Sequence, residues 1–156
     1  MSANFHKLEQ GLESSNKDVR LRSIKLILTH PDADTLQIVR CLASPDNQNF
    51  EFMEVFGLDS AMRSARDRLC ESNDPRAIAF LRELHAEDPI GNSNLVAHIL
   101  DCIRTPQALK LLYSYRDRAT GTRQYWIEDA IKVVKHHLEN SASEQDAAMK
   151  NQRKNE

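Results

Sequence analysis

The chain has 156 residues, of which 40% are apolar and 28% are charged, and its formal net charge is -2. This length predicts one domain with a continuous core, and only four glycines and five prolines argue against a loop-rich or all-β protein. The nearly balanced charge excludes a general attraction to nucleic acid or to an anionic membrane, so any such binding needs a local patch.

Two helices are predicted within the first 30 residues. Phe5, Leu8 and Leu12 recur at helical spacing in a first helix, which Gly11 weakens. Ser15 or Asn16 then caps a second helix, which ends at His30 and Pro31. The apolar positions of the second helix are Val19, Leu21, Ile24, Ile27 and Leu28.

Three segments of the chain open in the same way, after a Pro or an Asp, with small or apolar residues following at helical spacing. They are residues 34–42, 75–84 and 106–115. Each segment predicts a helix, and their similarity predicts stacked helical hairpins.

The interval between the first two of these openers is longer than the second interval. The prolines Pro31, Pro75 and Pro106 are 44 and 31 residues apart. We expect an inserted helix over residues 60–71, with Asp59 and Ser60 as a fresh N-cap after a strongly apolar helix that begins at residue 50. The alternative is one long kinked helix over 50–71.

The last part of the chain predicts two more helices and a tail. Asn92 or Ser93 caps a helix over 93–103, and Thr120-Gly121 turns the chain into a last helix, 123–138. Residues 140–156 contain no aromatic or branched aliphatic residue, so we expect a disordered tail. The ordered domain is therefore predicted at residues 4–139.

Residues 18–24 carry a Val-Arg pair, Val19-Arg20, in a second helix, and first helices begin with Asp-Pro or Thr-Pro followed by Ala and leucines. These motifs resemble the HEAT-like repeats of armadillo-type proteins. The resemblance implies an all-α fold, an α-α superhelix built as a short solenoid of about 8 to 9 helices. It also implies a concave groove that binds a protein partner. The groove would be lined by the second helices, at residues 17–29, 50–57, 93–103 and 123–138.

Few side chains suggest catalysis or metal binding. His98 and Cys102 have the i, i+4 spacing of two metal ligands on a helix, but zinc needs three or four ligands, and a packed Cys beside a half-buried His is the simpler interpretation. His136 and His137 are neighbours that point about 100° apart and cannot share one ion. We therefore predict no metal and no cofactor.

Two kinds of side-chain arrangement could in principle form an enzyme site. Trp126 and Asp129 resemble the aromatic and Asp pair in the groove of HEAT-like DNA glycosylases, but this chain lacks their strongly basic charge, so Trp126 is predicted to pack in the core or groove. The pairs Glu51 with Glu54 and Glu83 with Glu87 lie along one helix rather than across a cleft. No phosphate loop, nucleophile elbow or His-Glu-x-x-His stretch occurs, so we expect no enzyme.

Charge segregation is the remaining functional signal. Residues 17–25 and 104–123 are rich in Lys and Arg, whereas 83–101 holds four acidic residues and neither Lys nor Arg. Such blocks fit a charged partner, although ordinary solvated faces give the same pattern. Tyr and Arg are favoured at interface hot spots. The candidate binding residues are Arg20, Arg22, Lys25, Arg116, Arg118, Arg123, Tyr125 and Trp126.

The sequence thus predicts a non-catalytic scaffold or adaptor that binds a protein partner, as a monomer or a homodimer. A HEAT-like lyase that handles a chromophore and a nucleic-acid-binding protein that uses the basic blocks are the alternatives. No apolar run reaches the roughly 20 residues of a membrane span, and the first residues lack a secretion signal. Together with three separate cysteines in helical segments, this predicts a cytoplasmic protein without disulfides.

Overall fold

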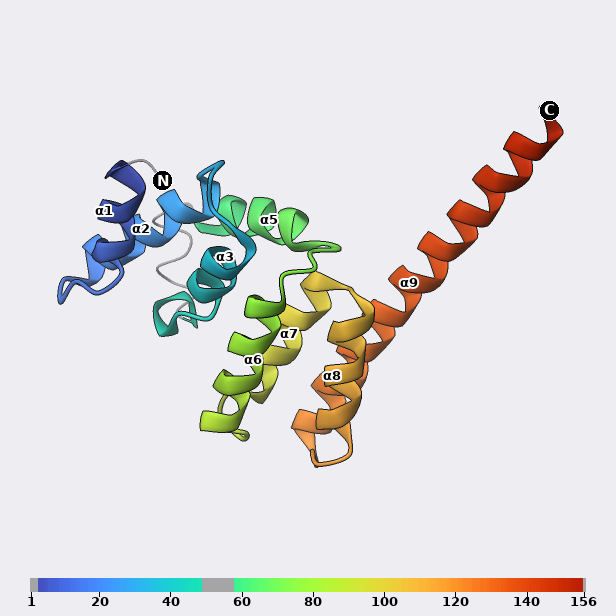
Figure 1. Cartoon of the computed structure of the whole chain (residues 1–156). Helices are drawn as coiled ribbons and strands as arrows, with labels where there is room; N and C mark the ends of the chain where they lie inside the picture. Colours follow the sequence, from blue (N-terminus) through green and yellow to red (C-terminus); the bar gives the residue numbers. More distant parts are fainter. Residues whose placement is uncertain (1–2, 49–57, 156) are drawn as a thin grey trace. The chain divides into compact units, whose positions relative to one another are not determined.

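The computed structural model describes residues 3–48 and 58–155, and all regular structure in these ranges is helical (Figure 1). The predicted all-α fold class is therefore confirmed. The described residues form eight α-helices and one short 3-10 helix. These elements are α1 (Ala3–Gly11), α2 (Lys17–Thr29), α3 (Thr35–Leu42), η1 (Pro45–Gln48), α5 (Leu58–Leu69), α6 (Pro75–Glu87), α7 (Ser93–Ile103), α8 (Pro106–Arg116) and α9 (Thr122–Lys154).

Helix starts follow local capping signals. The Asn16 side chain accepts a hydrogen bond of 2.9 Å from the N–H of Asp18 and caps α2. At α8 the Thr105 hydroxyl accepts from the N–H of Ala108 at 3.2 Å, and Pro106 takes the first helical position, where no N–H is needed. All three repeated openers begin a helix, at α3, α6 and α8, so this prediction is confirmed.

The helix predicted at residues 60–71 is α5, and its start differs from the prediction. Because α5 begins at Leu58, Asp59 and Ser60 lie inside the helix and the proposed N-cap is wrong. The helix ends before Glu71, whose φ of 65° lies in the left-handed region. The predicted helix over 50–57, and with it the first part of the alternative kinked helix, lies outside the described residues.

The chain divides into two compact units, whereas its length predicted one domain. Unit 1 comprises residues 1–83 and unit 2 residues 84–156, so the division falls within α6. Helical hairpins contact mainly their neighbours in the chain, which allows such a protein to build more than one local core.

In unit 1 the central element is α2, which packs against α1, α3 and α5. Its buried residues Leu21, Ile24 and Leu28 are at most 1% exposed. Burial of each such side chain stabilises the fold by roughly 1.5–3 kcal/mol. A Cβ atom at Gly11 would lie 2.0 Å from the Ser23 Oγ, so glycine is what lets the end of α1 approach α2. The residue that weakens α1 as an isolated helix thus has a packing role.

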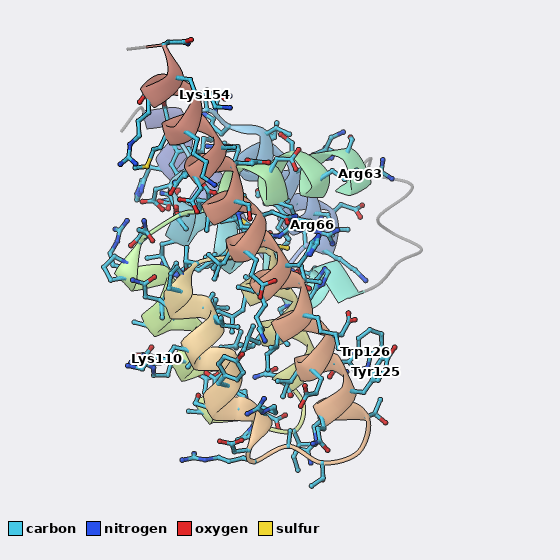
Figure 2. All side chains as sticks on the ribbon, turned by 90° about the vertical axis from the view of Figure 1, so that its right-hand side faces the viewer. Arg63, Arg66, Lys110, Tyr125, Trp126 and Lys154 are labelled. Carbon is cyan, nitrogen blue, oxygen red and sulfur yellow. The ribbon has the colours of Figure 1, made fainter. Side chains whose placement is uncertain are left out.

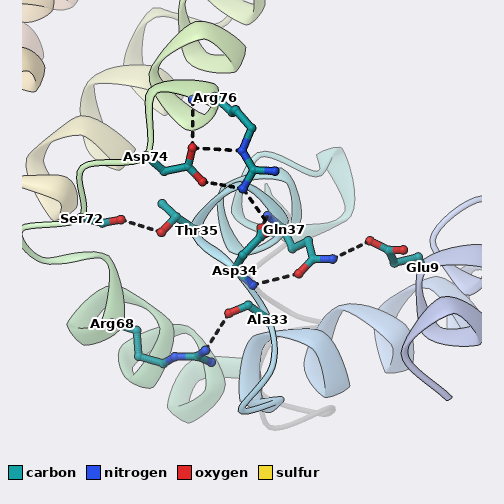
Figure 3. Close-up of polar contacts among 9 residues, drawn as sticks. All are labelled: Glu9, Ala33, Asp34, Thr35, Gln37, Arg68, Ser72, Asp74 and Arg76. Carbon is teal, nitrogen blue, oxygen red and sulfur yellow. Dashed lines mark hydrogen bonds and ion pairs between the residues drawn. The ribbon is translucent and has the colours of Figure 1, made fainter. Parts of the chain in front are cut away.

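A polar network joins α1, α3 and the start of α6 (Figure 3). Asp34 and Gln37 form a capping box: Asp34 Oδ1 accepts from the Gln37 N–H at 2.9 Å, and the Gln37 side chain accepts from the Asp34 N–H at 2.8 Å. The Gln37 amide also donates to Glu9 at 2.8 Å. Arg76 Nη2 lies 3.2 Å from Asp34 and 2.8 Å from Asp74. Asp34 therefore both starts α3 and links it to the first turn of α6.

Arg68 and a pair of hydroxyl groups tie α5 and the loop after it to the turn before α3 and to the first residue of α3 (Figure 3). The Arg68 guanidinium donates to the carbonyl oxygens of His30 at 2.9 Å and Ala33 at 2.8 Å. The hydroxyls of Thr35 and Ser72 are hydrogen bonded to each other. Arg68 is thus occupied by backbone acceptors and holds the turn between α2 and α3.

Unit 2 is built on α7, α8 and α9, which contact one another. Most of α7 is buried, including Val96, Leu100 and Ile103 at 0% exposure. Asn92 stands at the N-cap position of α7, as predicted, but its side chain makes no cap bond and instead donates to the carbonyl of Leu84 at 2.8 Å.

The last helix is much longer than the sequence predicted. Residues 140–154, expected as a disordered tail, continue α9, which has 33 residues and runs past α7 and α8 (Figure 1). Residues 142–155 are all exposed, so the absence of large apolar residues did indicate a segment outside the core. Ala, Glu, Gln and Lys are strong helix formers, which accounts for a helix without packing.

Candidate functional site

The candidate binding residues of α2 differ in their availability. Arg20 is engaged within the protein: its Nε and Nη2 atoms lie 2.9 Å and 3.2 Å from the two Asp46 oxygens, and Nη1 donates to the Ser14 carbonyl at 2.9 Å. The Arg20 guanidinium holds the pKa of the Asp46 carboxyl below its usual value. Arg20 therefore fastens η1 and the chain before α2, and its guanidinium is not displayed for a partner.

Arg22 and Lys25 are exposed, and two exposed apolar side chains, Val19 and Leu26, accompany them. Val19 was assigned to the apolar face of the second helix, but it is 40% exposed, and Leu26 is 50% exposed. Val19, Arg22 and Leu26 follow the i, i+3, i+7 pattern of one helix face. We call Val19, Arg22, Lys25 and Leu26 the α2 face.

The other five candidate residues lie at one end of unit 2. Arg116 ends α8, Arg118 follows it, and Arg123, Tyr125 and Trp126 lie in the first two turns of α9. Gly121 has a φ of 64°, a conformation that glycine adopts readily at a sharp turn between two helices. These residues lie within the turn and the first two turns of α9, and we call Arg118, Arg123, Tyr125 and Trp126 the α8–α9 corner.

Trp126 is a surface residue, so the core position that was one of the two predicted for it is wrong. Its side chain is 47% exposed and that of Tyr125 is 65% exposed (Figure 2). The two rings meet edge to face, with centroids 5.5 Å apart and an interplanar angle of 80°. Ile127, the next residue, is buried, because the α9 face toward α7 and α8 begins there. The corner thus presents a preformed aromatic pair to solvent.

The three arginines near the corner have different surroundings. The Arg116 guanidinium lies 4.8 Å from the centre of the Tyr113 ring and 3.6 Å and 3.9 Å from the carboxylates of Asp117 and Glu128. Within the described ranges, neither Arg118 nor Arg123 forms an ion pair. Arg116 is therefore largely neutralised, and the positive charge of the corner belongs to Arg118 and Arg123.

His85 belongs to the surroundings of the corner, although no sequence motif indicates it. Its ring stacks on that of Tyr115, with centroids 3.7 Å apart and an angle of 11°. Burial lowers the pKa of His85, and the positive charges of Arg118 and Arg123 lower it further. A neutral His85 adds no charge to the corner. Only the tertiary structure brings α6 to this place, so local sequence carries no signal for it.

The groups considered for metal binding or catalysis are occupied by local contacts. The Cys102 thiol donates to the backbone carbonyl of His98 at 3.3 Å, and the His98 ring lies 3.6 Å from the Asp101 carboxylate. His136 pairs with Asn140 at 3.1 Å. In residues 3–48 and 58–155, no three His, Cys, Asp or Glu side chains are placed to hold a metal ion.

The carboxylate pair that the structure describes lies on a helix surface. Glu83 and Glu87 are both exposed along α6, and Glu51 and Glu54 lie outside the described residues. A shallow depression on α9 is lined by Lys132, Val133, Lys135, His136 and Glu139. Five side chains of a single helix cannot enclose a small molecule, which usually needs a concave pocket.

Comparisons with protein-family models, with curated proteins and with solved structures find no match to this chain. In the part of the chain that is described, none of the helices combines the length and apolar character required to cross a bilayer.

Proposed function

We propose that this protein is a non-catalytic, HEAT-like helical module that binds an acidic segment of a partner protein at the α8–α9 corner. The observation that carries the proposal is the exposed pair of Tyr125 and Trp126 in the same helical corner as two arginines that form no ion pair in the described residues. Trp, Tyr and Arg are the residues most enriched at binding hot spots.

The geometry favours binding at low entropic cost. The two rings already hold each other edge to face, so little side-chain freedom remains to be lost on binding. Arg118 and Arg123 give the corner a positive potential, which complements carboxylates and speeds encounter with an acidic chain. An acidic segment with one or two apolar side chains therefore fits this surface.

The first experiment selects ligands from a random peptide display library on the immobilised full chain. We expect enrichment of peptides that combine Asp or Glu with apolar residues. Trp126→Ala and Arg123→Glu should each weaken the selected peptides by about tenfold or more, because both remove a hot-spot side chain.

Matched controls come from the α2 face, which also combines exposed apolar and basic side chains but has no aromatic residue. Leu26→Ala removes an exposed apolar side chain and Arg22→Glu reverses an exposed charge, and both should leave peptide binding unchanged. The proposal fails if the α2 variants lose binding and the corner variants keep it, or if the selected peptides show no acidic preference.

Single-stranded nucleic acid is a second candidate, because arginines beside exposed aromatic rings also suit base stacking. The same full chain titrated with labelled oligonucleotides distinguishes the two. Binding of nucleic acid that falls steeply with salt and requires Trp126 would replace the protein-binding proposal.

A further inference from the structure

The C-terminal half of α9 leaves one helix face without a partner in the chain described. In the first half of α9, Ile127, Ala130, Ile131 and Val134 are buried, at the i, i+3, i+4, i+7 spacing of one face. The same face continues through seven further residues. They are Leu138, Ser141, Ala142, Gln145, Ala148, Met149 and Gln152.

This continued face has the composition of a helix contact rather than of a solvated surface. None of its seven residues is charged, and Met149 is 54% exposed. Ser141, Ala142 and Ala148 are small enough to let a second helix approach closely. Since an isolated helix is marginal in water, the exposed half of α9 gains stability when that face is covered.

The charges beside the face are split along the helix. Glu139, Glu144 and Asp146 are the only charged residues in 139–146, and all are acidic, whereas Lys150, Arg153 and Lys154 are the charged residues of 147–154. Among the described residues no ion pair involves any of the six. The split therefore does not serve ion pairing within the described part of the chain.

We propose that two copies of this chain associate through the exposed half of α9, antiparallel and about a two-fold axis near residue 146. Antiparallel pairing sets the acidic half of each helix against the basic half of the other. In helix pairs, charges that flank the contact stripe set the orientation of the partners. Glu139, Asp146, Lys150 and Arg153 project on the same flank of the stripe, and in an antiparallel pair like flanks meet. A parallel pair in register instead sets like charges side by side.

A second copy is favoured over another partner because the segment is complementary to itself. A two-fold interface uses the same patch on both subunits, so the acidic half of each helix lies along the basic half of the other, and Glu139 of each copy faces Arg153 of the other. The proposal is independent of the α8–α9 corner, which lies at the other end of α9 (Figure 2).

The test is sedimentation equilibrium on the full chain and on two charge-reversed variants. One variant carries Lys150→Glu, Arg153→Glu and Lys154→Glu, and the other carries Glu139→Lys, Glu144→Lys and Asp146→Lys. We expect the wild type to form dimers as its concentration rises, more weakly at about 0.5 M than at about 0.05 M NaCl, since salt screens exposed charges.

Each variant alone should dimerise about tenfold or more weakly than the wild type, because its exposed helix then repels a second copy. An equimolar mixture should associate again, because the all-acidic helix complements the all-basic one. Association of the mixture also shows that both variants keep a folded helix.

The control carries Lys7→Glu, Arg82→Glu and Lys110→Glu, three exposed residues outside α9, and changes the net charge as much as the first variant does. It should dimerise like the wild type, as should Trp126→Ala. A wild type that stays monomeric into the millimolar range overturns the proposal. So does an equal loss in the control, or a mixture that fails to associate.

Discussion

Asp34→Ala tests the capping box that begins α3. The substitution leaves the Gln37 N–H without the Asp34 Oδ1 acceptor that now lies 2.9 Å away. Loss of a helix N-cap costs about 1 kcal/mol of stability. The Asp34 contact with Arg76 adds little, because that arginine is 60% exposed and keeps its contact of 2.8 Å with Asp74.

Asp34→Asn separates these two contributions. Asparagine is as good an N-cap as aspartate, but it removes the charge that Arg76 contacts. We therefore expect Asp34→Asn to retain nearly all of the stability that Asp34→Ala loses.

Amide hydrogen exchange followed by NMR, with urea unfolding followed by circular dichroism, measures both effects. The α3 amides should exchange about fivefold faster in Asp34→Ala and about as in wild type in Asp34→Asn. Equal losses in the two variants would place the stabilisation in the charge rather than in the cap. No loss in either variant would refute the capping argument altogether.

Three further predictions address titration and packing. Arg20 lowers the pKa of Asp46 in the folded protein, so the Arg20–Asp46 pair stabilises the fold at pH values above the pKa of Asp46 in the unfolded chain. This stabilisation is lost as the pH falls through the lower pKa of the folded state. The urea midpoint of wild type should therefore exceed that of Asp46→Asn at neutral pH, and the difference should shrink below about pH 4. A difference that persists into strong acid would contradict this linkage. Burial raises the pKa of Cys41 from 9.0 to about 12. Above about pH 9 the thiol therefore ionises more readily in the unfolded chain than in the folded protein, and the advantage in urea midpoint of wild type over Cys41→Ala should decline as the pH rises further. A constant advantage in alkali would contradict this prediction. Leu100→Ala should lower the free energy of unfolding in urea by about 2–5 kcal/mol, because Leu100 is 0% exposed. Leu26→Ala should lower it by less than about 0.5 kcal/mol, because Leu26 is 50% exposed. Equal losses would show that these two burial assignments are wrong.

Short-range signals in the sequence located most of the described helices. The caps at Asn16, Asp34 and Thr105 act on N–H groups two or three residues further along, so local residues suffice to start α2, α3 and α8. At α5 the same reasoning failed, because Asp59 and Ser60 look like a cap but lie inside the helix. A capping residue is effective only where the preceding chain is not helical.

The sequence by itself thus determined an all-α protein, most helix boundaries, and an end of the chain that contributes nothing large to a core. Tertiary structure alone decided which helix faces are covered. Val19 and Trp126 have apolar side chains at helical spacing, and spacing does not tell which side receives a neighbour. Arg20 was a candidate for binding until the fold brought it to Asp46, 26 residues away along the chain. Exposure and pairing depend on contacts between distant segments, and for that reason the packing of the helices, rather than composition, decided which candidate residues are exposed.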